Sequence, residues 1–164
     1  DDRPLIHSLV ILDGEIILEV TVHGLNDAMV SPTVNLIRIN RLVADHLIPW
    51  RQTQKLSDGF VREINIETPV DYTDVNGEVT LTGGMPIAPF ENTLLVQVIG
   101  LQSNQSFTSS IMVTAADVGM PATFTTSISL DKFPAGEVVI IQLVEVSMAD
   151  GSHMAYDSVV LKIK

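Results

Sequence analysis

The chain has 164 residues and a net charge of −11, from 20 acidic and 9 basic side chains. Such a negative field repels phosphates and anionic headgroups, so we expect no nucleic-acid or membrane-surface partner. Hydrophobic residues make up 46% of the chain, which favours a buried core over disorder. No run approaches the ~20 apolar residues of a transmembrane helix, and the first residues lack a signal-peptide pattern.

Cysteine is absent from the sequence. Secreted eukaryotic domains of this kind commonly depend on disulfides, so the absence favours a bacterial or archaeal source.

Runs rich in Val, Ile, Thr and Phe recur along the chain, separated by Gly, Asn, Asp and Pro, and predict strands. The expected strands are 5–12, 15–22, 34–39, 60–66, 78–82, 93–99, 109–114, 123–130, 137–146 and 157–163. Several of them alternate between apolar and polar residues, which is typical of antiparallel sheets in a sandwich. Only residues 41–47 could form a helix, and Pro49 would end it within two turns.

Three dipeptides predict tight turns between these strands. Asp13-Gly14 separates the first two strands, and both residue types tolerate the positive φ of a type I′ hairpin turn. Asn76-Gly77 gives the same signal before 78–82, and Asp150-Gly151 lies in the loop between the last two strands.

A weak internal repeat divides the chain. Residues 19–24 (EVTVHG) resemble 78–83 (EVTLTG), and residues 36–39 match 95–98, both at an offset of 59 (78 − 19 and 95 − 36). We therefore predict an N-terminal β unit over 1–68 and a complete domain over 69–164, as one immunoglobulin-like sandwich or two similar sandwich units packed together. The first unit has too few strands for a sandwich, so it would pack on the second or accept a strand from another chain.

The last hundred residues contain short motifs in a fixed order. A strand leads into Pro69, and 78–83 is followed by Phe90-Glu91 before the strand at 93–98. Residues 147–152 (SMADGS) precede the last strand. In this order the segment resembles the immunoglobulin-like domain of bacterial spore germination, a module of many bacterial cell-envelope proteins.

The resemblance implies an envelope-associated or secreted bacterial module without catalytic residues. The motif residues need only structural roles. Gly83 would end a strand where positive φ is needed, Phe90 would fill the core, and Asp150, Gly151 and Ser152 would form an Asx-type turn.

Catalytic and metal-binding patterns are weak. There is no Gly-x-Ser-x-Gly elbow, and His7, His23, His46 and His153 fall in separate segments without paired spacing. His7 and His23 could meet across adjacent strands. We predict no catalytic residue, no cofactor and no metal site, and the chain is not expected to be an enzyme.

Two groups of carboxylates leave calcium binding open as an alternative. Asp71, Asp74 and Glu78 surround the Asn76-Gly77 turn, and calcium prefers oxygen ligands from such loops. Asp150 and Asp157 could also meet across the last hairpin. The other reading of each group is a solvated acidic turn.

Trp50 is the only tryptophan, and aromatic residues are 5% of the chain, which argues against a strong carbohydrate-binding module. Trp50 would either fill a small satellite core or anchor a partner.

Together these features predict a non-enzymatic module of a bacterial secreted or envelope protein that contacts a protein or a cell-envelope polymer. The alternative is a calcium- or carbohydrate-dependent adhesion module. Exposed edge strands leave a homodimer open.

Overall fold

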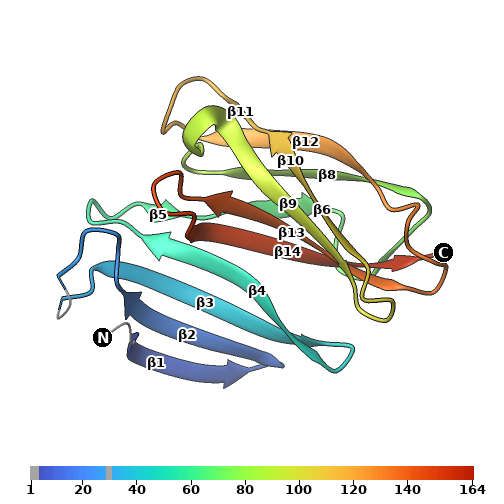
Figure 1. Ribbon diagram of the computed structural model, residues 1–164, viewed down its shortest axis with the longest axis horizontal. Coiled ribbons are helices and arrows are strands. Elements are labelled where there is room, and N and C mark those ends of the chain that lie inside the picture. Colours follow the sequence, from blue (N-terminus) through green and yellow to red (C-terminus); the bar gives the residue numbers. More distant parts are fainter. Residues whose placement is uncertain (1–3, 29–30) are drawn as a thin grey trace.

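The computed structural model describes residues 4–28 and 31–164, and it confirms the expected all-β class. These residues form one sheet of ten strands and one of four (Figure 1), antiparallel except for one short parallel pairing in the larger sheet. In chain order the elements are β1 (Leu5–Leu12), β2 (Glu15–Val22), β3 (Val34–Val43), β4 (His46–Lys55), β5 (Val61–Arg62), β6 (Asn65–Thr68), β7 (Thr73–Val75), β8 (Glu78–Met85), the 3-10 helix η1 (Phe90–Asn92), β9 (Thr93–Gly100), β10 (Ser106–Met112), β11 (Thr114–Ala115), β12 (Ala122–Ser129), β13 (Val138–Val146) and β14 (His153–Ile163). Within the described ranges, no helix is long and apolar enough to cross a bilayer.

The two sheets face each other over the C-terminal part of the chain. The larger sheet contributes β14, β13, β9 and β10, and the smaller sheet has the order β11-β12-β8-β6. Side chains at every second position of β8, β9, β12, β13 and β14 fill the space between them. The best shielded of these core side chains include Leu81, Leu94, Val96, Phe124, Ile141, Leu143 and Leu161. This alternation is what the sequence predicts for a sandwich.

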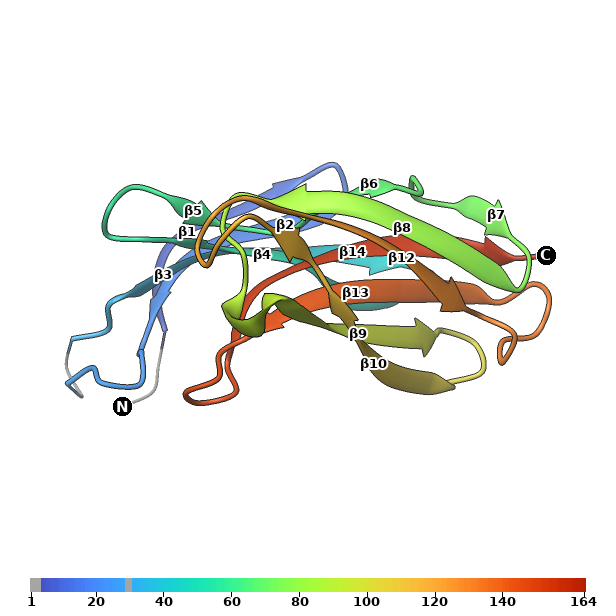
Figure 2. The ribbon, with the colours of Figure 1, turned by 90° about the horizontal axis from the view of Figure 1, so that it is seen from above.

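Strands β1 to β4, which we call the N-terminal meander, extend the larger sheet sideways beyond the sandwich (Figures 1 and 2). The meander joins the sandwich through β4 and β14, where Gln52 lies opposite Tyr156. All four of its strands belong to one sheet, so the expectation of two similar sandwich units is not met. β6, from the end of the predicted 1–68 unit, pairs with β8 in the smaller sheet.

Two hairpin turns shape the meander. Asp13 and Gly14 have φ of 50° and 81° and close the β1–β2 hairpin, as predicted. The helix considered for residues 41–47 is wrong: Ala44 and Asp45 have φ of 45° and 66° and turn β3 into β4. Positive φ at two consecutive residues suits a tight hairpin and breaks a right-handed helix.

Two residues of the motif series have roles other than those expected. Gly83 lies inside β8, where an added Cβ would come 2.1 Å from the Asn65 carbonyl oxygen, so close approach to β6 requires glycine. It has no positive φ. Phe90 was expected in the core but is 62% exposed on η1.

A second, smaller core holds the meander against the sandwich. Trp50 is 5% exposed and clusters with Val43, Leu101, Ile140 and Val160. Of the two roles considered for Trp50, the satellite-core role is confirmed. The Arg41 guanidinium lies 4.1 Å from the centroid of the Trp50 ring, an arrangement that favours the cation.

Candidate functional site

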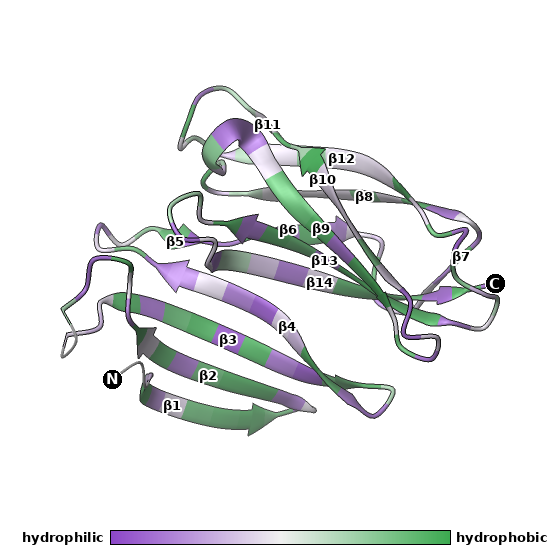
Figure 3. Ribbon diagram, in the orientation of Figure 1, coloured by the Kyte–Doolittle hydropathy of each residue, from purple (hydrophilic) through white to green (hydrophobic). Residues whose placement is uncertain are grey.

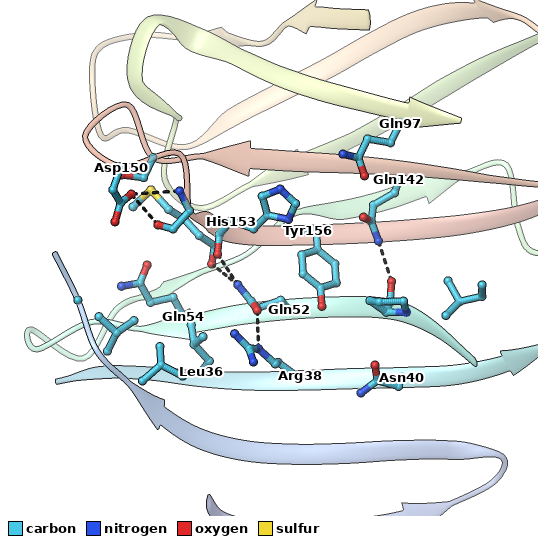
Figure 4. Close-up of a pocket in the computed structure, with 18 of the residues that line it drawn as sticks. Leu36, Arg38, Asn40, Gln52, Gln54, Gln97, Gln142, Asp150, His153 and Tyr156 are labelled. Atoms are coloured by element: carbon cyan, nitrogen blue, oxygen red, sulfur yellow. Dashed lines mark hydrogen bonds between the residues drawn. The ribbon is translucent and has the colours of Figure 1, made fainter. Parts of the chain in front are cut away.

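A cleft of about 820 Å³ lies between the N-terminal meander and the outer face of β13 and β14 (Figure 4). It forms because β4 leaves the plane of the sheet at its beginning. The Gln142 side chain on β13 donates from Nε2 to the Pro49 carbonyl on β4 at 2.7 Å, although β14 lies between these strands in the sheet. The first part of β4 therefore crosses over the outer face of β14.

Uncharged amide side chains are the most frequent polar groups in the cleft. They come from four strands of the same sheet and are Asn40, Gln52, Gln54, Gln97 and Gln142. Aliphatic side chains fill the spaces between them, among them Val22, Leu36, Ile48, Ile99 and Ile140. Such a surface offers both donors and acceptors to a ligand, with little net charge.

Gln52 anchors the middle of the cleft. It is 2% exposed, and its Oε1 accepts a hydrogen bond from Arg38 Nε at 2.8 Å. Its Nε2 donates to the carbonyl oxygen of His153 at the start of β14 (Figure 4). Gln52 thus ties β3, β4 and β14 together, and Arg38 is held by an uncharged partner.

The side-chain amides of Gln142 and Gln54 differ in their hydrogen-bond partners. Gln142 Nε2 also donates to Ser158 Oγ at 2.9 Å, which fixes its orientation. The Oε1 atom of Gln54 is shielded from solvent and has no hydrogen-bond partner within the part of the chain that the structure describes. A buried acceptor without a donor is costly to the folded state.

The rims of the cleft are held by two hydrogen-bonded loops. After β2, Asp27 Oδ2 accepts from the backbone amides of Gly24 and Thr33 at 2.8 and 2.7 Å. Between β13 and β14, Asp150 Oδ1 accepts from the amide and hydroxyl of Ser152 at 3.1 and 2.8 Å, which confirms the predicted Asx-type turn. Hydrogen bonds lower the pKa of both carboxyls, mainly from Gly24 to Asp27 and from Ser147 to Asp150.

Tyr156 is the aromatic residue closest to the middle of the cleft, but its ring is not open. The residue is 7% exposed, and its ring meets His153 edge to face with centroids 6.3 Å apart. Burial raises the pKa of the Tyr156 hydroxyl, so it stays protonated and can donate. A buried ring cannot serve as the stacking platform that sugar rings commonly use.

The structure does not bring the four histidines together into a metal site. His7 Nε2 lies 2.6 Å from Thr21 Oγ1 across the β1–β2 hairpin, and His46 Nδ1 lies 2.8 Å from the Ala44 carbonyl. His23 and His153 line opposite sides of the cleft. Among residues 4–28 and 31–164, no three His, Cys, Asp or Glu side chains are grouped for a metal ion.

The carboxylates considered for calcium are engaged separately. Asp71 accepts from Arg41 at 2.6 Å, and Asp74 lies 3.4 Å from the Lys164 ammonium. Asp157 is 6% exposed and accepts from the Ile66 amide at 2.8 Å, whereas Asp150 is exposed in its loop. Burial raises the pKa of Asp157, an environment that opposes a second negative ligand nearby.

Sequence reasoning did not identify the cleft residues. Gln142 was visible as a polar interruption of the apolar run 138–146, and Gln52 and Gln54 alternate along β4. Polar residues at isolated strand positions are common on exposed faces, so these signals alone do not indicate a site.

No family model matches the chain, and comparison with curated proteins gives no match. The fold defines the class: an all-β chain with a mainly antiparallel ten-stranded sheet and an antiparallel four-stranded sheet.

Proposed function

We propose that this chain is a non-enzymatic binding module of a bacterial secreted or envelope protein, and that its cleft binds an extended, uncharged segment of a partner polypeptide. The observation that carries the proposal is a cleft lined by amide side chains from four strands, of which Gln52 and the Nε2 of Gln142 are already engaged within the protein. Amides can donate to and accept from a peptide backbone at the same time, as neighbouring strands do.

The mixture of side chains favours a polypeptide over a glycan. Aliphatic residues that keep part of their surface exposed, such as Val22, Ile48 and Ile99, line the cleft with the amides and suit alternate side chains of an extended peptide. The aromatic residue in the middle of the cleft, Tyr156, is buried and offers no open face to a sugar ring.

The charged side chains that line the cleft favour an uncharged ligand. Arg38 is hydrogen-bonded to Gln52, so its donors are partly used within the protein. Asp150 at the rim keeps its charge because hydrogen bonds lower its pKa. Arg38 and Asp150 carry opposite charges, so the cleft has little net charge to attract an ion, and an ionised ligand group would lose hydration on entering it.

A display experiment tests this function. The purified chain would be panned against a random dodecapeptide library and, in parallel, against an array of bacterial glycans. We expect enrichment of peptides poor in Asp, Glu, Lys and Arg. Enrichment of glycans with no peptide signal would contradict the polypeptide ligand and favour the carbohydrate alternative.

Two substitutions test whether the selected peptides bind in the cleft. Ile99→Arg adds bulk and charge at a 42% exposed position of the cleft wall. We expect it to raise the dissociation constant of the selected peptides at least ~10-fold. Val118→Arg is the matched control at a 74% exposed apolar position that does not line the cleft. Equal loss of binding by both variants would place the peptide elsewhere.

A further inference from the structure

Strand β1 is an edge of the ten-stranded sheet, and both of its faces are uncovered. All eight of its residues are exposed. Six of them are large apolar residues with exposed fractions of 47–71%: Leu5, Ile6, Leu9, Val10, Ile11 and Leu12. An edge strand also presents unpaired backbone donors and acceptors, so β1 combines free hydrogen-bonding groups with an apolar surface.

This edge has few of the features that usually prevent strand pairing, and its register is irregular only between Ile6 and Ser8. β1 contains no Lys, Glu, Asp or Pro, and its only polar residues are His7 and Ser8. The opposite edge of the same sheet, β10, begins Ser-Phe-Thr-Ser-Ser and presents mainly hydroxyl groups. Hydropathy colouring shows the contrast between the two edges (Figure 3).

The charge distribution allows two copies to meet at β1. Residues 1–55 carry seven acidic and five basic side chains (net −2), whereas residues 56–164 carry thirteen acidic and four basic ones (net −9). Near β1, Glu15 is paired with Arg41 at 2.6 Å and Glu19 with Lys55 at 2.7 Å. Most of the negative charge therefore lies away from this edge, where salt screens it.

We propose that β1 pairs in antiparallel fashion with β1 of a second copy across a two-fold axis, joining the two ten-stranded sheets into one. A strand without carboxylates, lysine or arginine can face its own copy without repulsion between like charges, and most of its apolar side chains then meet apolar partners. The contact uses the same surface of both copies, so it closes after two subunits. Pairing of β1 with the hydroxyl-rich β10 edge would instead leave its apolar side chains beside polar ones.

The absence of cysteine from the chain provides a background-free test by disulfide formation. Single cysteines would be placed at Ser8, Leu9 or Val10 near the middle of the strand, and at Leu5 or Leu12 at its ends. Antiparallel pairing brings a central position close to its own copy but separates equivalent end positions by ~13 Å or more. Disulfides require Cα atoms within about 7 Å.

The expected result is oxidative dimer formation by at least one central variant and by neither end variant. Equal cross-linking at the centre and the ends would indicate parallel or non-specific association and would overturn the proposal. Absence of cross-linking at all five positions would overturn it as well.

Analytical ultracentrifugation of the full chain gives an independent measurement. We expect a concentration-dependent dimer, and Leu9→Lys with Ile11→Lys should raise its dissociation constant at least ~10-fold, because like charges then meet across the axis. Both positions are exposed, so circular dichroism should show an unchanged fold. Val118→Lys is the matched control. A wild-type monomer at all concentrations, or equal weakening by the control, would overturn the proposal.

Discussion

The guanidinium of Arg62 on β5 donates a hydrogen bond to the carboxylate of Glu145 on β13, joining positions 83 residues apart. Glu145 is 2% exposed, and the Arg62 side chain is 16% exposed. The second carboxylate oxygen of Glu145 and the Nε of Arg62 have no partner within the described part of the chain. Burial raises the pKa of Glu145, while Arg62 opposes the shift. The charge of Glu145 is thus held inside the sandwich chiefly by one residue.

Removing one member of this pair should destabilise the fold strongly. Glu145→Ala leaves the Arg62 guanidinium without its partner, and we expect the free energy of unfolding to fall by ~3–5 kcal/mol. Urea denaturation followed by circular dichroism would measure the loss.

The exposed pair formed by Arg51 and Glu63 serves as the control, because its side chains are 30% and 38% exposed. Glu63→Ala should cost at most ~1 kcal/mol. Replacing both Arg62 and Glu145 by leucine should recover much of the loss of Glu145→Ala, since no buried charge remains. A double variant less stable than Glu145→Ala would contradict this account.

Asp157 should make folding stability depend on pH in a defined direction. Its pKa is raised mainly by burial, while the hydrogen bond from the Ile66 amide opposes the shift. The folded state therefore binds the Asp157 proton more tightly than the unfolded state, whose pKa is about 3.9. The contribution of this group to stability is largest below pH ~4 and is lost as pH rises through the folded-state pKa.

The substitution Asp157→Asn keeps an acceptor for the Ile66 amide and removes the ionisation. We expect the stability of Asp157→Asn relative to wild type to rise with pH above ~4. Asp150→Asn should show the opposite trend, because hydrogen bonds, led by that from Ser147, lower the pKa of Asp150. Urea denaturation between pH ~4 and ~8 tests Asp157, and denaturation below pH ~5 tests Asp150. A stability difference between wild type and Asp157→Asn that does not depend on pH would contradict the assignment.

Local patterns in the sequence predict the sandwich well. In β14, Val159, Leu161 and Ile163 lie in the main core as their alternation indicates, and Asp13-Gly14 forms its hairpin. These features depend on neighbours within a few residues, so the sequence carries them directly.

The meander and the cleft depend on contacts between distant segments, which local patterns do not encode. β4 was missed because Pro49 and Trp50 resemble a loop, although Gln52 pairs with Tyr156 more than a hundred residues later. The amides of the cleft come from β3, β4, β9 and β13, and only the sheet topology brings them together.

Gly83 should not tolerate even a methyl group. An added Cβ would lie 2.1 Å from the Asn65 oxygen and 2.5 Å from the Phe124 ring, so β6 would have to separate from β8. We expect Gly83→Ala to lower the free energy of unfolding by at least ~3 kcal/mol, measured by thermal denaturation. At Gly14 an added Cβ meets open space, but φ is +81°. We therefore expect Gly14→Ala to lower the free energy of unfolding by only ~1–2 kcal/mol. Equal losses would show that close approach is not the cause.

The lone Trp50 reports directly on whether the meander stays docked on the sandwich. Trp50 is 5% exposed between Val43 and the outer-face residues Ile140 and Val160, so its emission should be blue-shifted in the folded chain. Trp50→Ala should cost ~3–5 kcal/mol through the cavity that it leaves. If the predicted units 1–68 and 69–164 unfold together, Trp50 emission and far-ultraviolet circular dichroism will change at the same urea concentration.

A second probe separates docking from global unfolding. In a Trp50→Phe background, Phe107→Trp places a tryptophan beside Phe133, whose ring centroid lies 6.2 Å from that of Phe107 in the sandwich. One cooperative unit predicts the same urea midpoint for both probes, after correction for the stability of each variant. A red shift of Trp50 at a urea concentration that leaves the Phe107→Trp signal unchanged would show that the meander undocks before the sandwich unfolds.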